Sequence, residues 1–270
     1  MKISIITPTY NSEKNIDKCV QSIINQTYKN FEHIIIDNCS TDNTIQKIKQ
    51  AYLFNKTMSN LRIISEKDYG ISDAFNKGIN MASGDIIGIL NSDDYYYSNN
   101  VFEKMISVFN DKSILFAHGN ILFVDELYGS NIRKPLLCDL REAMPYNHPT
   151  MFIRKKLYQD VGQFDTGFKY AMDFDFVCKI KSRYNNMDSI SVYIQGDPIT
   201  VMNAGGTSWA NEIGSIKETK KILSNYKLWD SRANVNYISR LFRTRLKALL
   251  SFGGLNFLVK KWREKKWKIE

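Results

Sequence analysis

Two adjacent carboxylates, Asp93 and Asp94, follow a short apolar run in the segment Asn91-Ser92-Asp93-Asp94. Neighbouring carboxylates repel each other, and the repulsion is costly unless water or a cation lies between them. Oxygen ligands suit Mg²⁺ or Mn²⁺, which proteins commonly share with substrate phosphates. The segment therefore predicts a divalent-cation site. A solvated turn explains it equally well when the segment is taken alone, because Asn, Ser and Asp are common turn residues.

A carboxylate and an aromatic ring follow two other apolar runs. Asp37 comes directly after the run at residues 31–36, and Tyr10 follows Thr7-Pro8-Thr9. A carboxylate at Asp37 could accept the imide N–H of uracil, and Tyr10 could stack on the base. A turn or a helix cap is the structural alternative for Asp37, and ordinary packing is the alternative for Tyr10.

Two further acidic positions lie near the starts of expected helices. Asp173, in Met172-Asp173-Phe174-Asp175, could act as general base for an acceptor hydroxyl, although the helix dipole also favours carboxylates at a helix N-terminus. Asp73 could face a ligand crevice, but Lys77 follows four residues later, so a surface ion pair explains Asp73 as well. None of these positions decides the chemistry by itself.

The elements that would position these residues alternate in type. Apolar runs rich in β-branched residues predict strands at residues 3–7, 31–36, 61–64 and 85–90, and helical spacing predicts helices between them, one at 71–81. This alternation favours a mainly parallel sheet with helices on both faces. Ligands of such sheets lie outside the carboxyl ends of the strands. We therefore expect the candidate residues after the first, second and fourth strands to converge on one crevice.

The charge of the chain is concentrated at its C-terminal end. The net charge is +9, and residues 231–270 contain eleven Lys/Arg against two acidic residues, a difference of nine. Apolar residues at helical spacing accompany these cations from Ile238 to Leu250, and Trp262 and Trp267 follow. This pattern is typical of a helix on an anionic membrane surface. A helix packed on the body by its apolar face is the alternative.

Composition argues against several other classes. The body has no basic patch interleaved with aromatics, so nucleic acid is not an expected partner. The four cysteines form no CxxC pair, so neither a zinc site nor a disulfide framework is indicated. No signal peptide and no apolar stretch of membrane-spanning length is present. We expect a cytoplasmic protein attached peripherally to the inner face of the plasma membrane.

Four segments together resemble the motifs of family 2 glycosyltransferases, and they occur in the family's order at residues 5–11, 35–44, 65–78 and 84–94. The resemblance is dense over residues 1–100 and looser to about residue 220. It implies an α/β GT-A (Rossmann-like) fold with a mixed, mainly parallel sheet flanked by helices. The implied organisation is a catalytic domain at residues 1–220, with a nucleotide-binding half (1–100) and an acceptor-binding half (101–220). A helical, basic amphipathic C-terminal region follows at residues 221–270.

The resemblance also implies roles for single residues. It assigns nucleotide binding to Pro8, Thr9, Tyr10, Asp37, Asp68, Asp73 and Ser92. Asn91-Ser92-Asp93 stands at the family's Asp-x-Asp motif, so Asp93 and Asp94 are the expected ligands of Mn²⁺ or Mg²⁺ although Asn91 replaces the first aspartate. Asp173 matches the catalytic base, but Met172 stands where the family has Glu. Positions expected to orient acceptor or donor are Asn91, His148, Gly206 and Thr207.

The reaction implied is an inverting transfer from a UDP-sugar to a hydroxyl of a saccharide acceptor. A membrane-bound tail would suit an acceptor linked to polyprenyl diphosphate, as in bacterial surface polysaccharide synthesis of O-antigen or capsule. One alternative is a degenerate, non-catalytic family member that binds nucleotide-sugar, which the substitutions at Asn91 and Met172 favour. Another is a sugar nucleotidyltransferase, which residues 8–15 disfavour because they contain no glycine and only Lys14 as a cation.

Overall fold

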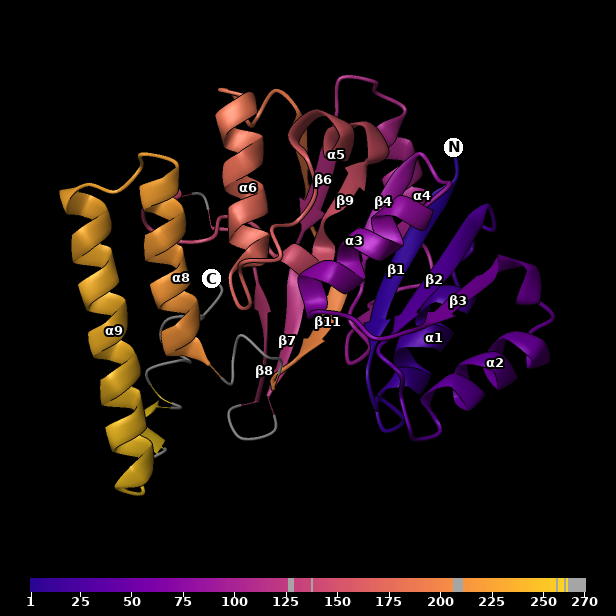
Figure 1. The fold of residues 1–270 in the computed structure, drawn as a ribbon, viewed down its shortest axis with the longest axis horizontal. Coiled ribbons are helices and arrows are strands. Elements are labelled where there is room, and N and C mark those ends of the chain that lie inside the picture. The colour runs from indigo at the N-terminus through magenta and orange to yellow at the C-terminus, as the bar shows by residue number, and fades with distance from the viewer. Residues whose placement is uncertain (126–128, 137, 206–210, 256, 260, 262–270) are drawn as a thin grey trace.

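The predicted alternation of strands and helices is present in the computed structural model, which describes residues 1–125, 129–136, 138–205, 211–255, 257–259 and 261 (Figure 1). The main sheet contains β1 (Ile3–Thr9), β2 (Phe31–Asp37), β3 (Leu61–Ser65), β4 (Ile86–Ile89), β6 (Phe116–Gly119), β9 (Phe152–Arg154) and β10 (Ser191–Ile194). Their order across the sheet is β10-β6-β9-β4-β1-β2-β3. All pairings are parallel except those of β9, which runs antiparallel to β4 and β6. The mixed, mainly parallel sheet expected from the sequence is confirmed.

Two hydrophobic cores lie on opposite faces of this sheet because side chains alternate along each strand. Ile3 and Ile5 of β1 pack toward one face with helices α1 (Ile16–Ile24), α2 (Thr44–Phe54) and α4 (Val101–Phe109). Ile6 packs toward the other face with α3 (Ile71–Met81), α5 (Lys155–Val161) and α6 (Met172–Arg183). The apolar stripes of these helices therefore cover both faces, as the sequence predicted.

A second sheet and two long helices complete the described structure. The second sheet has the order β5-β11-β7-β8, formed by β5 (Tyr95–Tyr96), β7 (Ile121–Asp125), β8 (Gly129–Arg133) and β11 (Thr200–Asn203). Two short 3₁₀ helices, η1 (Met58–Asn60) and η2 (His148–Thr150), precede β3 and β9. Helices α8 (Glu212–Asn225) and α9 (Ser231–Phe252) follow β11 and lie side by side at one end of the molecule (Figure 1). The boundary expected at residue 220 falls within α8, whose Ile222 and Leu223 share the core of α6.

A loop of several residues separates β1 from the first helix. The helix begins at Ile16, and its N-cap residue, Asn15, makes no side-chain capping bond. Asn11 has a left-handed backbone with φ 46°, and its side-chain oxygen accepts a hydrogen bond from the backbone N–H of Thr41. The residues between β1 and α1 thus form a loop tied to the next strand–helix connection.

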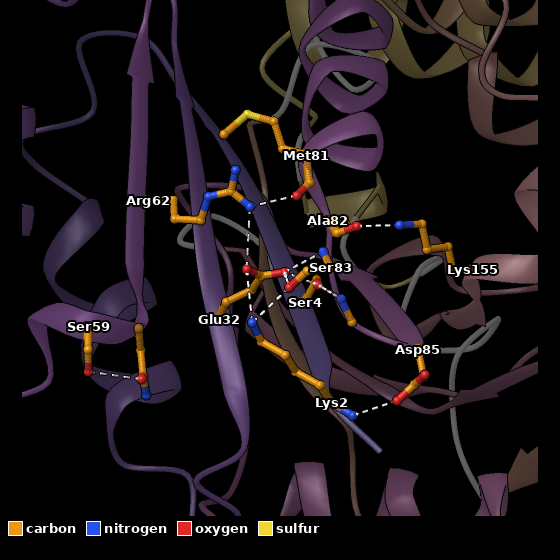
Figure 2. A network of polar contacts seen from close by, with 12 residues as sticks. Lys2, Ser4, Glu32, Ser59, Arg62, Met81, Ala82, Ser83, Asp85 and Lys155 are labelled. Atoms are coloured by element: carbon orange, nitrogen blue, oxygen red, sulfur yellow. Dashed lines mark hydrogen bonds and ion pairs between the residues drawn. The ribbon is translucent and has the colours of Figure 1, made fainter.

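A buried carboxylate holds together the amino ends of the central strands (Figure 2). Glu32 is 4% exposed, and its Oε1 accepts bonds from the Ser4 hydroxyl (2.6 Å) and the Ser83 backbone N–H (2.6 Å). Its Oε2 lies 3.2 Å from Lys2 Nζ and 3.5 Å from an Arg62 guanidinium nitrogen. Burial raises the pKa of Glu32, but these hydrogen bonds outweigh that effect and lower the pKa to about 2. This network is at the opposite end of β1 from Thr9.

The free energy of unfolding is expected to depend on Glu32 and on acid pH. An unfolded Glu has a pKa of about 4.3. Because the folded pKa is lowered, the stabilisation is complete above the unfolded value and is lost as pH falls through about 2. A Glu32→Gln variant should therefore be less stable than the parent at pH 6, and the difference should shrink towards pH 2. Urea titrations of both proteins across this range measure it, and a difference independent of pH would contradict the assignment.

Candidate functional site

A cleft of about 810 Å³ opens at the carboxyl ends of the strands. Its walls come from the loops after β1, β2, β3 and β4, from the first residues of α3, and from the loop before α6. The predicted site residues that line it are Pro8, Thr9, Tyr10, Asp68, Asn91, Ser92 and Asp93. The crevice expected at the carboxyl ends is therefore present.

One end of the cleft is flanked by two exposed aromatic rings. Tyr10 is 61% and Tyr69 88% exposed, although both line the cleft. Between their loops, the side-chain oxygen of Asn38 accepts a bond from the backbone N–H of Asp68 (3.0 Å), and an Asp68 carboxylate oxygen accepts one from the Gly70 N–H (2.9 Å). Flat, solvent-accessible rings beside a fixed amide suit the stacking and edge recognition of a planar heterocycle. Sequence reasoning did not single out Asn38 or Tyr69.

Asp37 does not line the cleft, and its contact with the imide N–H of uracil stays a prediction. Its carboxylate is fully buried and accepts four hydrogen bonds. The donors are the hydroxyls of Thr9 (3.0 Å), Ser40 (2.5 Å) and Ser65 (2.6 Å), together with the Ser40 N–H (3.0 Å). Because both oxygens are occupied, Asp37 joins three loops behind the cleft.

Asp73 is also outside the cleft lining. One of its oxygens accepts a bond from the Tyr69 N–H (3.1 Å) and lies 3.4 Å from Lys77 Nζ. The surface ion pair considered from the sequence is therefore present. The cleft is lined instead by the N-terminus of α3 itself, at Gly70, Ile71 and Ser72. Free backbone N–H groups at a helix N-terminus favour anions such as phosphate.

The Asn91-Ser92-Asp93-Asp94 segment divides into a cleft side and a buried side. Asn91, Ser92 and Asp93 line the cleft, and the Ser92 hydroxyl lies 2.9 Å from that of Ser12 on the opposite loop. Asp94 is 2% exposed and accepts a bond from the Asn203 backbone N–H (3.2 Å). The two carboxylates predicted as joint metal ligands therefore face different surroundings: Asp93 faces the cleft, whereas Asp94 is turned inward.

The electrostatics of this segment suit a divalent cation. Burial raises the pKa of Asp93, and burial followed by the Asp93 charge raises the pKa of Asp94 well above its usual value. The side-chain oxygen of Asn91 is buried without a hydrogen-bond partner among the described residues. A cation between Asn91 and Asp93 would satisfy the orphaned oxygen and offset the carboxylate repulsion. Within the described residues no group of three or more His, Cys, Asp or Glu side chains is arranged so that it could hold a metal ion.

Asp173 lies in the first turn of α6, outside the residues that line the cleft. It is half-buried. Burial lowers the pKa of His148, and the charge of the Asp173 carboxylate opposes that shift. The His148 ring packs against Phe75 and Phe164, with centroids 5.8 and 6.0 Å away. Asp173 is therefore near enough to His148 to influence its charge, and neither residue lines the cleft.

The loop before α6, residues 162–171, is held from two sides. From α3, the Ser72 hydroxyl donates to the Phe168 carbonyl (3.2 Å), and the Asn76 amide exchanges two bonds with the backbone of Phe164 (2.9 and 3.0 Å). From α8, the Glu218 carboxylate accepts bonds from the backbone N–H groups of Lys169, Tyr170 and Ala171 (2.9, 2.8 and 2.9 Å).

The loop of residues 162–171 in turn places Thr166, Phe168 and Lys169 in the cleft wall. Sequence reasoning missed Lys169 and Glu218, and no local pattern marks either.

Replacing Glu218 should loosen this loop. A Glu218→Gln variant would turn an amide N–H₂ toward at least one backbone donor, because both carboxylate oxygens accept bonds. We expect the free energy of unfolding to fall by about 2 kcal/mol and amide hydrogen exchange at residues 169–171 to rise about tenfold or more. Hydrogen-exchange mass spectrometry measures the second effect. Lys217→Ala, an exposed position on the same helix, is the matched control. Unchanged exchange at residues 169–171 would show that Glu218 does not hold the loop.

The last predicted positions lie at a glycine pair after β11. Gly205 lines the cleft and has a positive φ of 121°, a conformation that side chains rarely adopt. Gly206 and Thr207 lie outside the described residues.

Comparison with known proteins identifies the family. Residues 4–177 match the model of glycosyl transferase family 2. An uncharacterized glycosyltransferase of Rickettsia bellii is 28% identical over 236 residues, which cover 83% of this chain and 33% of that protein. The chondroitin synthase of Pasteurella multocida (strain Pm70) is 29% identical over 210 residues, which cover 74% of this chain and 21% of that protein. This chain spans 33 to 58% of the length of the first three curated relatives that it matches.

Solved structures support the same fold. The S. aureus TarS fragment 1–349 in complex with UDP-GlcNAc aligns with a TM-score of 0.66 at 20% identity, covering 92% of this chain and 76% of that chain. The mannosyltransferase PcManGT of Pyrobaculum calidifontis, in complex with GDP-Man and Mn²⁺, aligns with a TM-score of 0.66 at 16% identity, covering 97% and 81%. The likeness shows that the GT-A architecture is shared. With the family match over residues 4–177, it establishes that this chain belongs to glycosyltransferase family 2.

Proposed function

We propose that the chain is a glycosyltransferase that takes its sugar from a UDP-sugar and uses a divalent metal ion, Mn²⁺ or Mg²⁺. The observation that carries the proposal is the composition of the cleft at the strand ends. Two exposed tyrosines, a helix N-terminus, Asn91 and Asp93 all line this one cleft. The tyrosines suit a base, the helix N-terminus suits a diphosphate, and Asn91 and Asp93 suit the cation that a diphosphate carries.

Two neighbours support a nucleotide-sugar donor. TarS has been crystallised with UDP and with UDP-GlcNAc, and PcManGT with GDP-Man and Mn²⁺. In this chain we assign the stacking of the base to Tyr10 and Tyr69, and contact with its edge to Asn38. Asp37 then supports this region by fixing Thr9, Ser40 and Ser65.

The proposed chemistry is a single displacement with inversion. An acceptor hydroxyl transfers its proton to the Asp173 carboxylate as its oxygen forms a bond to the anomeric carbon of the donor. The bond between that carbon and the diphosphate oxygen breaks, and UDP leaves with the bonding electron pair. A metal ion held by Asp93 and Asn91 would neutralise charge on the diphosphate. The N-terminus of α3 stabilises the same charge, and burial, which lowers the pKa of His148, makes that ring a weaker base than a free imidazole.

The acceptor and setting follow from the rest of the chain. We propose a saccharide linked to polyprenyl diphosphate as acceptor, in the synthesis of a bacterial surface polysaccharide such as O-antigen or capsule, with the chain at the inner face of the plasma membrane. The support is the basic C-terminal region and the likeness to a polysaccharide synthase. In the described residues no helix has the length and apolar character to cross a bilayer.

Nucleotide binding is the first test of this proposal. Thermal unfolding of the purified chain would be followed with UDP, GDP, dTDP and CDP, each with and without Mn²⁺. A ligand at about 100 times its dissociation constant stabilises a fold by about 2.7 kcal/mol. We expect stabilisation by UDP that grows with Mn²⁺, followed by turnover of a UDP-sugar with an inverted anomeric configuration by NMR. Preference for another base would overturn the uridine assignment. Binding without turnover of any donor would favour the degenerate, non-catalytic alternative.

A further inference from the structure

Helix α9 lies on the body by its polar side and leaves its apolar side outward. One side of the helix carries Ala233, which is buried, and Tyr237, Arg240, Thr244 and Lys247, which are half-buried. Two leucines near the edges of this side, Leu241 and Leu250, are half-buried as well. Lys247 Nζ lies 2.6 Å from a carboxylate oxygen of Glu212 on α8. The opposite side carries an apolar row, which we call the outward row: Val235, Ile238, Phe242, Leu246 and Leu249, which are 65, 56, 65, 42 and 68% exposed.

The outward row is continuous along the helix. Its members are spaced by three or four residues, so they project from one side of the helix over more than three turns. A helix on the surface of a globular body usually has the reverse arrangement, with its apolar stripe against the core. The alternative that α9 packs on the body by its apolar face is therefore excluded for Ser231–Phe252. A contiguous exposed apolar row of this kind marks an interaction surface.

The charges beside the outward row indicate what it contacts. α9 contains five Lys/Arg and no acidic residue. Arg243 and Arg245 are exposed and project from opposite sides of the row. Arg240 is turned inward, and burial lowers its pKa while Glu212 opposes that shift. Apolar side chains flanked by free cations complement the headgroup region of an anionic bilayer. If two copies instead paired through this row, arginines would lie on both edges of the interface and repel each other.

We propose that the outward row of α9 is a docking surface for an anionic lipid bilayer. Phe242 and its apolar neighbours enter the headgroup boundary, and Arg243 and Arg245 contact lipid phosphates. The helix lies flat on the surface, because one side remains attached to α8 through Lys247 and Ala233. This docking does not depend on the proposed transfer reaction and is measurable without any donor or acceptor.

Sedimentation with vesicles tests the docking surface. The full chain would be mixed with vesicles of phosphatidylcholine alone or of phosphatidylcholine with phosphatidylglycerol. We expect binding to the anionic vesicles that weakens with salt. A Phe242→Ser, Leu249→Ser double variant should bind about a hundredfold more weakly, since each apolar side chain contributes about a factor of ten when buried. An Arg243→Gln, Arg245→Gln double variant should bind anionic vesicles about thirtyfold more weakly, at about 1 kcal/mol for each of the two cations.

The matched control lies at the other end of the molecule. Phe54 on α2 is 87% exposed, and Figure 1 places α2 and α9 on opposite sides. Phe54→Ser should therefore leave vesicle binding unchanged. The proposal fails if the parent chain does not bind anionic vesicles, or if Phe54→Ser reduces binding as much as the α9 variants do. It also fails if light scattering reveals a dimer that the Phe242→Ser, Leu249→Ser variant dissociates, because the row would then be covered by a second copy. All substituted positions are exposed, and unchanged thermal unfolding would verify their folds.

Discussion

Replacing Asp93 by Asn is expected to reduce turnover of the donor about a thousandfold and to remove the Mn²⁺-dependent part of UDP binding. Asp93 is the carboxylate of its segment that faces the cleft. Its removal takes away the charged oxygen that we assign to the cation, and transition-state stabilisation of several kcal/mol depends on that cation. UDP binding by thermal shift, with and without Mn²⁺, and initial rates with a UDP-sugar measure the two effects.

Asp94→Asn is the matched control, because it makes the same chemical change one residue away. Asp94 is 2% exposed, and its Oδ1 accepts a bond from the Asn203 N–H that an asparagine oxygen can also accept. We expect this variant to keep its Mn²⁺-dependent binding within a few-fold. If Asp94→Asn lost the metal effect and Asp93→Asn kept it, the assignment of the inward and outward carboxylates would be reversed.

Much of the fold could be predicted from the sequence because the apolar pattern of each central strand agrees with its buried position in the sheet. The strands at residues 3–9 and 31–37 are rich in isoleucine and buried on both faces, so adjacent apolar residues, Ile5-Ile6 and Ile34-Ile35-Ile36, mark them in the sequence. Strands β10 and β11 are different. Their residues are partly exposed or polar, as in Ser191–Ile194, and their pairing partners β6 and β7 lie about 75 residues earlier in the chain, as the pairs Ser191↔Phe116 and Thr200↔Ile121 show. No local sequence pattern indicates which distant strands they pair with.

The candidate site was predictable where residues follow strands and unpredictable where tertiary contacts decide orientation. Tyr10 and Asp93 lie at strand ends that converge in any parallel sheet. The direction in which the Asp37 carboxylate points depends on its hydrogen bonds with Ser40 and Ser65, and the hydroxyl of Ser65 comes from a different strand. Glu218 acts on backbone groups nearly fifty residues earlier, so no motif reveals it. The sequence therefore predicts the position of the cleft better than the orientation of the side chains around it.

Replacing Asp173 by Asn is expected to lower the turnover number by a factor of about 100 to 10,000, the range that a general base usually contributes. UDP binding should remain unchanged, because Asp173 lies outside the residues that line the cleft. Asparagine retains the shape and the oxygen that accepts the Phe174 N–H (2.8 Å), but it cannot take the hydroxyl proton. The measurement is the rate under saturating donor together with the dissociation constant of UDP.

The neighbouring carboxylate provides a control that separates chemistry from packing. Asp175 is 2% exposed, accepts a bond from the Tyr226 hydroxyl (3.2 Å) and lies 3.3 Å from Lys179 Nζ. It therefore connects α6 with α8, and Asp175→Asn should lower the free energy of unfolding while the turnover number of the folded protein stays within a few-fold of the parent. A large loss of turnover in Asp175→Asn, with Asp173→Asn active, would transfer the role of base to Asp175. Comparable losses in both would instead mean that the first turn of α6 acts through its position, because two substitutions with different contacts would then have the same consequence.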